Sequence, residues 1–289
     1  MTGILTNGHH RSSVNSPNLS GAVGRIIIIP TYNEAANIGV LVPQLFSAVS
    51  DIHVLVVDDN SPDGTAQVCE SLAKAYPNLQ VLKRKNPEGL GRAYVAGFEF
   101  ALNHGFDVIG TMDADLSHNP SCLPAMLELI AENDVVIGSR YVHGGGTVNW
   151  PLRRVVLSWT ANKFAGILLR VPAHDLTSGY RLYRRKALEW IEPQQFRSNG
   201  YSFLVEALYR AHDRGARIGE SPIVFQDRTN GQSKLHSREI YRGAFSLFRL
   251  RFEKIAKKVQ HEEEAEETSA VPAHLSLVAT RSSRTARIK

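Results

Sequence analysis

Residues 25–65 read RIIIIPTYNEAANIGVLVPQLFSAVSDIHVLVVDDNSPDGT and indicate which architecture to expect. The apolar run 26–29, stopped by Pro30, is typical of a buried strand, and the apolar positions of 35–49 follow helical spacing. A second apolar run, 53–57, ends in the polar turn DDNSPDGT. A buried strand, a helix and another buried strand in succession predict two parallel strands joined by a helix.

The same alternation continues along the chain. Helical spacing recurs at residues 66–75, 93–103 and 123–132, and short apolar strands at 79–83, 108–112 and 135–137. We therefore expect an α/β fold with a mainly parallel mixed sheet flanked by helices. Ligands of such sheets bind at the carboxyl ends of the strands, so residues 30–34, 58–63 and 113–115 are expected to form one site.

The formal net charge of +5 is divided unevenly along the chain. Residues 1–137 carry −7, residues 138–260 carry +13, and the last 29 residues carry −1. This division predicts two kinds of ligand, a metal cation for the acidic half and phosphates or an anionic membrane for the basic half. The two cysteines are too few for a disulfide framework or a four-ligand zinc site, which favours a reducing compartment.

Two basic segments, 151–171 and 240–258, interleave apolar and aromatic residues with Lys and Arg. The pattern is typical of amphipathic helices that lie at a membrane interface, and also of helices whose apolar face packs on their own domain. Because no stretch reaches the roughly eighteen uninterrupted apolar residues of a spanning helix, no transmembrane segment is expected.

Carboxylates follow two of the predicted strands. Asp113 and Asp115, two residues apart, can converge on one hard cation, or can form only a turn and a helix cap. Asp58 and Asp59 end another apolar strand, where a ligand or the turn that follows would use them. Either use is compatible with these residues taken alone.

Together, these loops resemble those of glycosyltransferase family 2, whose members have the GT-A fold. The matching segments are IPTYNE at 29–34, VDDNSPDGT at 57–65 and DAD at 113–115. Downstream segments resemble the branch of the family that transfers mannose to dolichyl or polyprenyl phosphates. These are GSRY at 138–141, WPLRR at 150–154, DLTSGYR at 175–181, GYSF at 200–203 and RTNGQSK at 228–234. The resemblance covers about residues 25–245.

The resemblance implies roles for individual residues. The nucleotide-sugar pocket would be lined by Pro30, Tyr32, Glu34, Val57, Asp58, Asp59, Asp113, Ala114, Arg228 and Lys234. Mg²⁺ or Mn²⁺ would be held by Asp113 and Asp115, with Ser117 as a weak ligand where relatives commonly have Gln. The acceptor phosphate would be bound by Arg140, Arg154 and Ser158, although Arg154 can equally be a snorkelling helix residue. The residues expected to be catalytic are Asp115, Arg140, Arg228 and Lys234.

The reaction implied by the resemblance is inverting transfer of mannose from GDP-mannose to a polyprenyl monophosphate. The protein would be bound peripherally at the cytoplasmic face of the cell membrane, with an integral membrane partner left open. A catalytic domain, residues 25–258, would combine a nucleotide and metal half, 25–137, with an acceptor and membrane-facing half, 138–258. Residues 1–24 and 259–289 are expected to be disordered arms, because they lack apolar periodicity.

Two other functions stay open on the sequence. One is transfer of glucose or another sugar from a nucleotide sugar to the same kind of acceptor. A more distant one is a nucleic-acid-binding module that uses the basic half, although no signature of such a module is present and nucleic acid is not expected as a partner. A non-catalytic scaffold is disfavoured by the intact Asp113, Asp115, Arg140 and Lys234.

Overall fold

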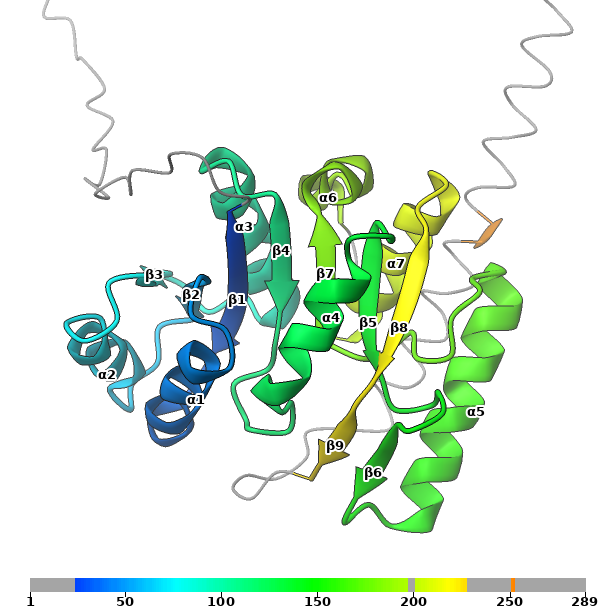
Figure 1. The fold of residues 1–289 in the computed structure, drawn as a ribbon, viewed down its shortest axis with the longest axis horizontal. Helices are drawn as coiled ribbons and strands as arrows, with labels where there is room; N and C mark the ends of the chain where they lie inside the picture. The colour runs from blue at the N-terminus through cyan, green and yellow to red at the C-terminus, as the bar shows by residue number, and fades with distance from the viewer. Residues whose placement is uncertain (1–23, 197–200, 228–250, 253–289) are drawn as a thin grey trace, which may run out of the picture. The chain divides into compact units, whose positions relative to one another are not determined.

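The computed structural model describes residues 24–196, 201–227 and 251–252. Its main feature is a seven-stranded sheet in the order β3-β2-β1-β4-β7-β5-β8 (Figure 1). The strands are β1 (Arg25–Thr31), β2 (His53–Asp58), β3 (Leu79–Lys83), β4 (Val108–Thr111), β5 (Val135–Ser139), β7 (Arg181–Arg184) and β8 (Ile218–Pro222). Only β7 runs antiparallel to its neighbours, β4 and β5. The expected mainly parallel mixed sheet is therefore confirmed.

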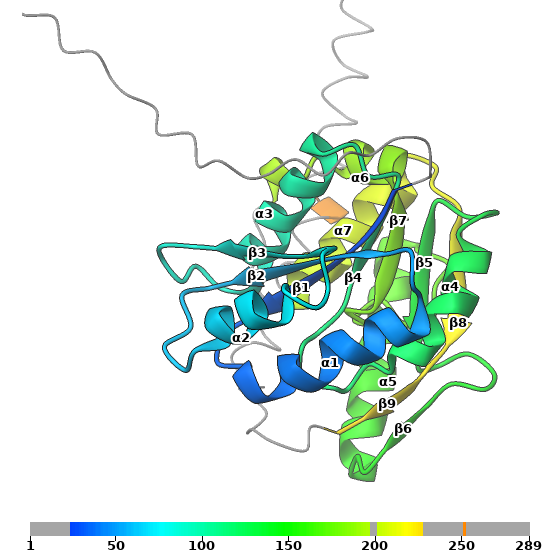
Figure 2. The ribbon, with the colours of Figure 1, turned by 60° about the vertical axis from the view of Figure 1, so that its left-hand side comes forward.

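Helices cover both faces of this sheet (Figures 1 and 2). One face carries α1 (Ala35–Ala48), α2 (Thr65–Leu72) and α4 (Leu123–Leu129), and the other carries α3 (Leu90–Asn103), α6 (Arg185–Ile191) and α7 (Tyr201–Asp213). Short 3₁₀ helices lie at Pro120–Cys122 (η1) and Pro193–Gln195 (η2).

Helix α5 (Leu152–Leu169) lies at the β8 edge of the sheet in Figure 1. Beside its N-terminal end is a parallel two-stranded ribbon of β6 (Gly146–Val148) and β9 (Val224–Gln226). No helix within the described parts of the chain has the length and hydropathy needed to cross a bilayer.

Strand β1 is buried on both of its faces, which explains why its isoleucines do not alternate with polar residues. Ile27 and Ile29 belong to a core cluster with Leu41 and Leu45 of α1. On the opposite face, Ile28 lies against Gly97 of α3, where an added Cβ would stand 2.5 Å from the Ile28 Cγ2 atom. Complete burial stabilises each such side chain by about 1.5–3 kcal/mol, so this strand anchors the loop that follows it.

The prediction that Pro30 ends the first strand is wrong, because β1 continues to Thr31. The Thr31 carbonyl accepts a hydrogen bond on the β2 side, so the nitrogen of Pro30, one residue earlier, is directed to the β4 side. Strand β4 ends at Thr111, opposite Ile28. The missing N–H of Pro30 therefore removes no bond from the ladder.

Candidate functional site

The loops after β1 and β2 are fastened to each other by hydrogen bonds. The backbone N–H of Asn33 donates to the Ser61 hydroxyl at 3.0 Å, and that of Glu34 donates to the Thr65 hydroxyl, also at 3.0 Å. Two of the three segments that the sequence predicted to share one site are thus joined directly at the carboxyl edge of the sheet.

One carboxylate, that of Asp63, caps two helices. Its Oδ2 atom accepts from the N–H of Ala35 at the start of α1, and its Oδ1 atom accepts from the N–H and hydroxyl of Thr65 at the start of α2. Burial acts to raise the pKa of Asp63, but these hydrogen bonds outweigh it and the pKa is lowered. Asp63 therefore stays ionised where two helix N-termini favour negative charge.

Asp58 and Asp59, both predicted to line the nucleotide pocket, are buried and bound within the protein. The carboxylate of Asp58 accepts from the Thr31 hydroxyl at 3.0 Å and from the N–H and hydroxyl of Ser61 at 3.0 and 2.6 Å. These contacts shape the turn that follows β2.

The Asp59 carboxylate holds the loop before α3. It accepts from Arg84 at 2.5 Å and from the backbone N–H groups of Glu88 and Gly89 at 3.1 and 2.9 Å. Arg84 also binds the Glu88 carboxylate at 2.7 Å. Asp59 thus links the end of β2 to the glycine loop at the start of α3.

The other residues predicted for the nucleotide pocket divide by exposure. Pro30, Val57 and Ala114 are buried, whereas Tyr32 is exposed and Glu34 is half-buried. The Glu34 carboxylate accepts from the Asn37 amide at 2.6 Å. Tyr32 and Glu34 are therefore the members of this set that present side chains at the surface.

The loop after β4 presents the carboxylates of Asp113 and Asp115. The Tyr94 hydroxyl donates to Asp113 Oδ1 at 3.1 Å, and burial, followed by the charge of Asp113, raises the pKa of Tyr94 well above its ordinary value. Asp115 Oδ1 accepts from the N–H and hydroxyl of Ser117 at 3.1 and 2.5 Å. Because the Ser117 hydroxyl donates to Asp115, its contribution to a metal site stays a prediction.

A buried histidine supports this loop from behind. The Asp113 N–H donates to His118 Nδ1 at 3.2 Å, which places the ring proton on Nε2. Burial lowers the pKa of His118, although Asp113 and Asp115 act in the opposite direction. The neutral ring packs at 5.2 Å from the Tyr180 ring and 5.4 Å from that of Phe225.

The residues of this loop fit a divalent cation that binds together with a diphosphate. Among the described residues, no group of three or more His, Cys, Asp or Glu side chains is placed to hold a metal alone. Two carboxylates completed by substrate phosphates and water are the usual set for Mg²⁺. Gly179 leaves room beside Asp113, since an added Cβ would lie 3.2 Å from its Oδ1 atom.

The predicted acceptor residue Arg140 follows β5 and is nearly buried. Its Nε and Nη2 atoms donate to the carboxylate of Asp175 at 2.7 and 2.6 Å, and its backbone N–H donates there at 3.0 Å. Burial acts to raise the pKa of Asp175, but the hydrogen bonds and charge of Arg140 outweigh it, and the pKa is lowered. Arg140 is thus held in one orientation.

The second predicted arginine, Arg154, lies in the first turn of α5 near Arg140. It pairs with Asp227 at 2.9 Å, and its guanidinium carbon lies 3.9 Å from the Trp150 ring. The Arg140 guanidinium carbon lies 5.4 Å from the same ring, and Phe225 packs against Trp150 at 5.3 Å. The rings of Trp150, Phe225 and His118 therefore connect both arginines to the loop after β4. Ser158, half-buried, follows Arg154 by one helical turn.

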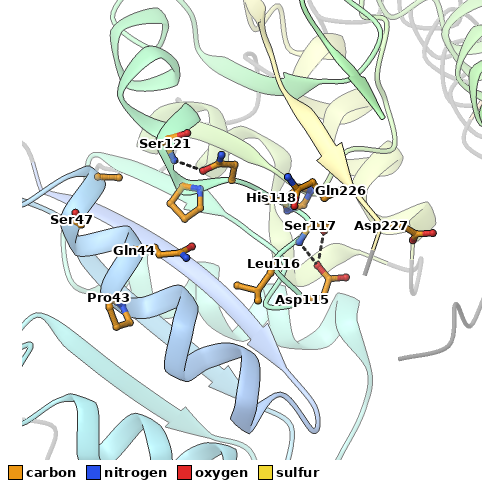
Figure 3. A pocket seen from close by; sticks show the side chains of 13 residues that line it. Pro43, Gln44, Ser47, Asp115, Leu116, Ser117, His118, Ser121, Gln226 and Asp227 are labelled. Carbon is orange, nitrogen blue, oxygen red and sulfur yellow. Dashed lines mark hydrogen bonds between the residues drawn. The ribbon is translucent and has the colours of Figure 1, made fainter. Parts of the chain in front are cut away.

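A cavity of about 740 Å³ reaches Asp115 beside α1 (Figure 3). Its side chains are mostly small or polar, and the lining comprises Pro43, Gln44, Ser47, Ala48, Asp115, Leu116, Ser117, His118, Asn119, Pro120, Ser121, Gln226 and Asp227. Within the described part of the chain this lining includes none of the residues predicted for the nucleotide pocket. The cavity therefore adds space next to the carboxylate loop rather than outlining the nucleotide site.

Comparison with known proteins places the chain in a family. The family model "Glycosyl transferase family 2" matches residues 26–191, more than half of the chain. The chain belongs to glycosyltransferase family 2. It is therefore a glycosyltransferase, and the resemblance noted in its loops is confirmed.

Two curated relatives of this glycosyltransferase match over most of its length. The polyprenol monophosphomannose synthase of Mycolicibacterium smegmatis is 45% identical over 224 residues, which cover 77% of this chain and 84% of the relative. The undecaprenyl-phosphate mannosyltransferase of Micrococcus luteus is 44% identical over 210 residues, covering 73% and 86%.

Solved structures support the GT-A fold. Glucosyl-3-phosphoglycerate synthase from Mycobacterium tuberculosis, in complex with Mn²⁺, UDP and glucosyl-3-phosphoglycerate, has a TM-score of 0.56 at 17% identity, with 78% of each chain covered. A mannosyltransferase from Pyrobaculum calidifontis, in complex with GDP-Man and Mn²⁺, has a TM-score of 0.53 at 18% identity, covering 80% of this chain and 64% of that one. At these identities the likeness establishes the fold alone.

Part of the site of this glycosyltransferase was not predicted from its sequence. Arg228 and Lys234 lie outside the described residues, so their roles stay predictions. Tyr94, His118 and Asp175 received no role, although they support Asp113 and Arg140. For Asp175, the DLTSGYR segment was a signal that could have been followed, whereas nothing in the local sequence around Tyr94 indicates its contact with Asp113.

Proposed function

We propose that this glycosyltransferase transfers mannose from GDP-mannose to a polyprenyl monophosphate, yielding polyprenyl phosphate mannose and GDP. The observation that carries the proposal is the 45% and 44% identity, over most of the chain, with two relatives named for joining mannose to polyprenyl lipids. The matched length includes the carboxylate loop and both arginines of the acceptor side, so the similarity spans the site as well as the scaffold.

Asp113 and Asp115 are the residues proposed to hold Mg²⁺ or Mn²⁺ against the donor diphosphate. When bound, the cation would neutralise charge that develops on the diphosphate as the sugar leaves. Tyr94 and His118 position Asp113 through its side chain and backbone. Arg228 and Lys234 are proposed to reach the same diphosphate, and Tyr32 and Glu34 to meet the nucleoside.

Asp115→Ala tests the metal assignment. Loss of a preorganised charged group in such sites lowers kcat by about 10²–10³, and we expect a loss of at least this size in mannolipid synthesis. The assay follows radiolabel passing from GDP-mannose into organic-extractable lipid at increasing Mg²⁺. Near-normal turnover by the variant with added Mg²⁺ would show that Asp115 is not a metal ligand.

The acceptor supplies its own nucleophile in the proposed reaction. An oxygen of the polyprenyl phosphate, ionised at neutral pH, attacks the anomeric carbon of mannose while the bond from that carbon to the diphosphate breaks, which inverts the configuration. No general base is needed, in contrast to attack by a sugar hydroxyl. The work left to Arg140, Arg154 and Ser158 is to align the acceptor phosphate and balance its charge.

The surface of α5 supports peripheral contact with a membrane. Six of the twelve large apolar side chains exposed in the described residues belong to this helix, namely Leu152, Val156, Leu157, Trp159, Phe164 and Ile167. Its buried side chains are Asn162, Ala165 and Leu169. The apolar face of α5 is thus directed outward, with exposed Arg153 and Lys163 among its residues. We propose that it lies at the cytoplasmic face of the membrane, where the lipid acceptor is also held. The second basic segment, 240–258, lies almost wholly outside the described residues.

The proposed reaction is tested with the purified full-length protein and a short-chain polyprenyl phosphate. GDP-mannose and UDP-glucose, each radiolabelled in the sugar, are compared with and without EDTA. We expect lipid-linked mannose from GDP-mannose, lost with EDTA and restored by Mg²⁺ or Mn²⁺. If product formed only from UDP-glucose, the transferred sugar would be glucose and not mannose. A rate that EDTA does not change would contradict the metal requirement.

A further inference from the structure

The face of α5 that is directed inward binds the loop between Val171 and β7. Asn162, which is 1% exposed, accepts the backbone N–H groups of Leu176 and Thr177 at its Oδ1 atom, at 2.7 and 3.2 Å. Its Nδ2 atom donates to the Thr177 hydroxyl at 3.1 Å and to the Ser158 carbonyl at 2.9 Å. Asn162 thus uses both ends of its amide to hold this loop against the helix.

The Thr177 hydroxyl lies at the junction of three polar side chains. It accepts from Arg140 Nη2 at 2.8 Å and from Asn162 Nδ2 at 3.1 Å, and it donates to Asp175 Oδ1 at 3.3 Å. The hydroxyl thus accepts two hydrogen bonds and donates one, which is its full capacity. One oxygen atom therefore connects α5, the buried carboxylate and the acceptor arginine.

The same loop is held from the opposite side by β8. The Glu220 carboxylate accepts from the backbone N–H groups of His174 and Asp175 at 2.9 and 3.1 Å. Asp175 is consequently fixed through its backbone, and its side chain in turn fixes Arg140. The orientation of the guanidinium thus depends on contacts made by two separate elements, α5 and β8.

We propose that Thr177 is a positioning residue whose hydroxyl orients Arg140 and couples it, through Asn162, to α5. The role deepens and rests on the proposed function, in which Arg140 meets the acceptor phosphate. A guanidinium held in advance loses less freedom when the phosphate binds, and its charge is already aimed at the reacting group. Without the hydroxyl, Asp175 still binds Arg140, so the charge stays in place but its orientation is less restricted.

The test compares variants that remove or keep the hydroxyl. Thr177→Val preserves the shape of the side chain and Thr177→Ala removes it, whereas Thr177→Ser keeps the hydroxyl. Ser71→Ala is the control, because it removes an exposed hydroxyl from α2, a helix given no part in acceptor or membrane binding. Initial rates are measured with each substrate varied in turn, together with the unfolding midpoint of every variant.

Thr177→Val and Thr177→Ala are expected to lower kcat/KM for the polyprenyl phosphate about tenfold, the scale of one hydrogen bond to a charged group. The KM for GDP-mannose should stay within about twofold, and Thr177→Ser and Ser71→Ala should match the wild type. If Thr177 had a purely structural role, kcat/KM would fall for both substrates alike, and the size of the fall would correlate with the decrease in the unfolding midpoint.

Three outcomes would overturn this role: wild-type kinetics in both hydroxyl-free variants, a Thr177→Ser defect as large as that of valine, or equal losses for the two substrates. These are distinguishable from failure of the proposed function. A wild-type protein that transfers no mannose overturns that function and the role that rests on it, whereas an active wild type with unaffected variants overturns the role of Thr177 alone.

Discussion

Most of the carboxylates in this site are occupied by protein groups, and this sets what each can do. Asp58 and Asp63 accept from their own turn and from the start of α1, and Asp59 holds the loop before α3. These three carboxylates therefore hold the loops of the site in place. Asp113, with part of its side chain exposed and Gly179 opposite, is better placed to meet a cation. Residues of one chemical type therefore divide between supporting the loops and facing a ligand.

Asp63→Ala should destabilise the protein more than the loss of an equally exposed aspartate that caps no helix. The carboxylate caps two helices, and the loss of one cap costs about 0.5–2 kcal/mol, so we expect a loss of about 1–3 kcal/mol in the free energy of unfolding. Urea unfolding of the variant against Asp107→Ala, which removes a carboxylate that makes no side-chain cap in the described contacts, would measure it. Equal stabilities of the two variants would show that the double cap contributes nothing.

The Asp175–Arg140 pair should make stability depend on acid pH. Because the pKa of Asp175 is lowered in the folded protein, its contribution is complete above the ordinary aspartate pKa of about 4 and is lost as pH falls toward the folded value. At neutral pH, Asp175→Asn leaves a buried arginine without its counter-charge, at a cost of about 3–5 kcal/mol.

The measurement is urea unfolding of wild type and Asp175→Asn over a series of pH values. The difference in the free energy of unfolding between wild type and Asp175→Asn should become smaller below about pH 4. Asp51→Asn is the matched control, because its partner Arg25 forms an exposed pair at 3.1 Å that adds little to stability. A wild-type advantage that is unchanged from neutral pH to pH 3 would contradict the assignment.

Among the elements, α5 differs most from an ordinary helix of a globular domain, because its exposed side is apolar. Val156→Ser should weaken binding to phosphatidylcholine vesicles that contain phosphatidylglycerol, by about tenfold if the valine is buried there. Val40→Ser is the matched control, since Val40 is exposed to a similar extent on α1. Sedimentation of the protein with vesicles measures the binding, and equal losses in both variants would contradict a membrane role for α5.

Strands and helices up to residue 137 could be predicted because their apolar periods are strong, and the three loops follow from them. Strand β7 could not, because its sequence RLYR begins and ends with arginine. Arg181 is nevertheless completely buried, with its guanidinium donating to the carbonyls of Ser178, Leu204 and Leu176. A buried arginine whose guanidinium is satisfied by backbone carbonyls, one of them on α7, has no signature in the sequence of the strand itself.

The site residues were predictable to a different extent. Asp113, Asp115, Arg140 and Arg154 could be named from their motifs, and the structure brings both arginines around Trp150. Apart from His118, their supports come from other parts of the sequence, as when Tyr94 of α3 binds Asp113. Such contacts depend on how helices pack on the sheet, which periodicity does not specify.

For the protein as a whole, metal and nucleotide should stabilise the fold only in combination. With two carboxylates and no larger cluster in the described residues, Mg²⁺ alone has too few ligands to bind tightly. GDP with Mg²⁺ at about 100 times the apparent Kd should add about 2.7 kcal/mol, which raises Tm by about 5–10 °C. Thermal scans with Mg²⁺, GDP, both, or both plus EDTA would show it, and an equal shift with Mg²⁺ alone would indicate a complete protein metal site.

The position of Trp150 has an optical consequence. Of the three tryptophans, Trp150 stacks under Arg154 beside Arg140, Trp159 lies on the exposed face of α5, and Trp190 lies near Lys186 on α6. Indole emission responds to nearby charge and to the polarity of its surroundings. In a Trp159→Phe, Trp190→Phe protein the remaining fluorescence should respond to the proposed binding of acceptor phosphate at Arg140 and Arg154. If Trp159 is retained instead, the proposed contact of α5 with lipid should shift its emission to the blue, so the two single-tryptophan proteins would test acceptor binding and membrane contact separately.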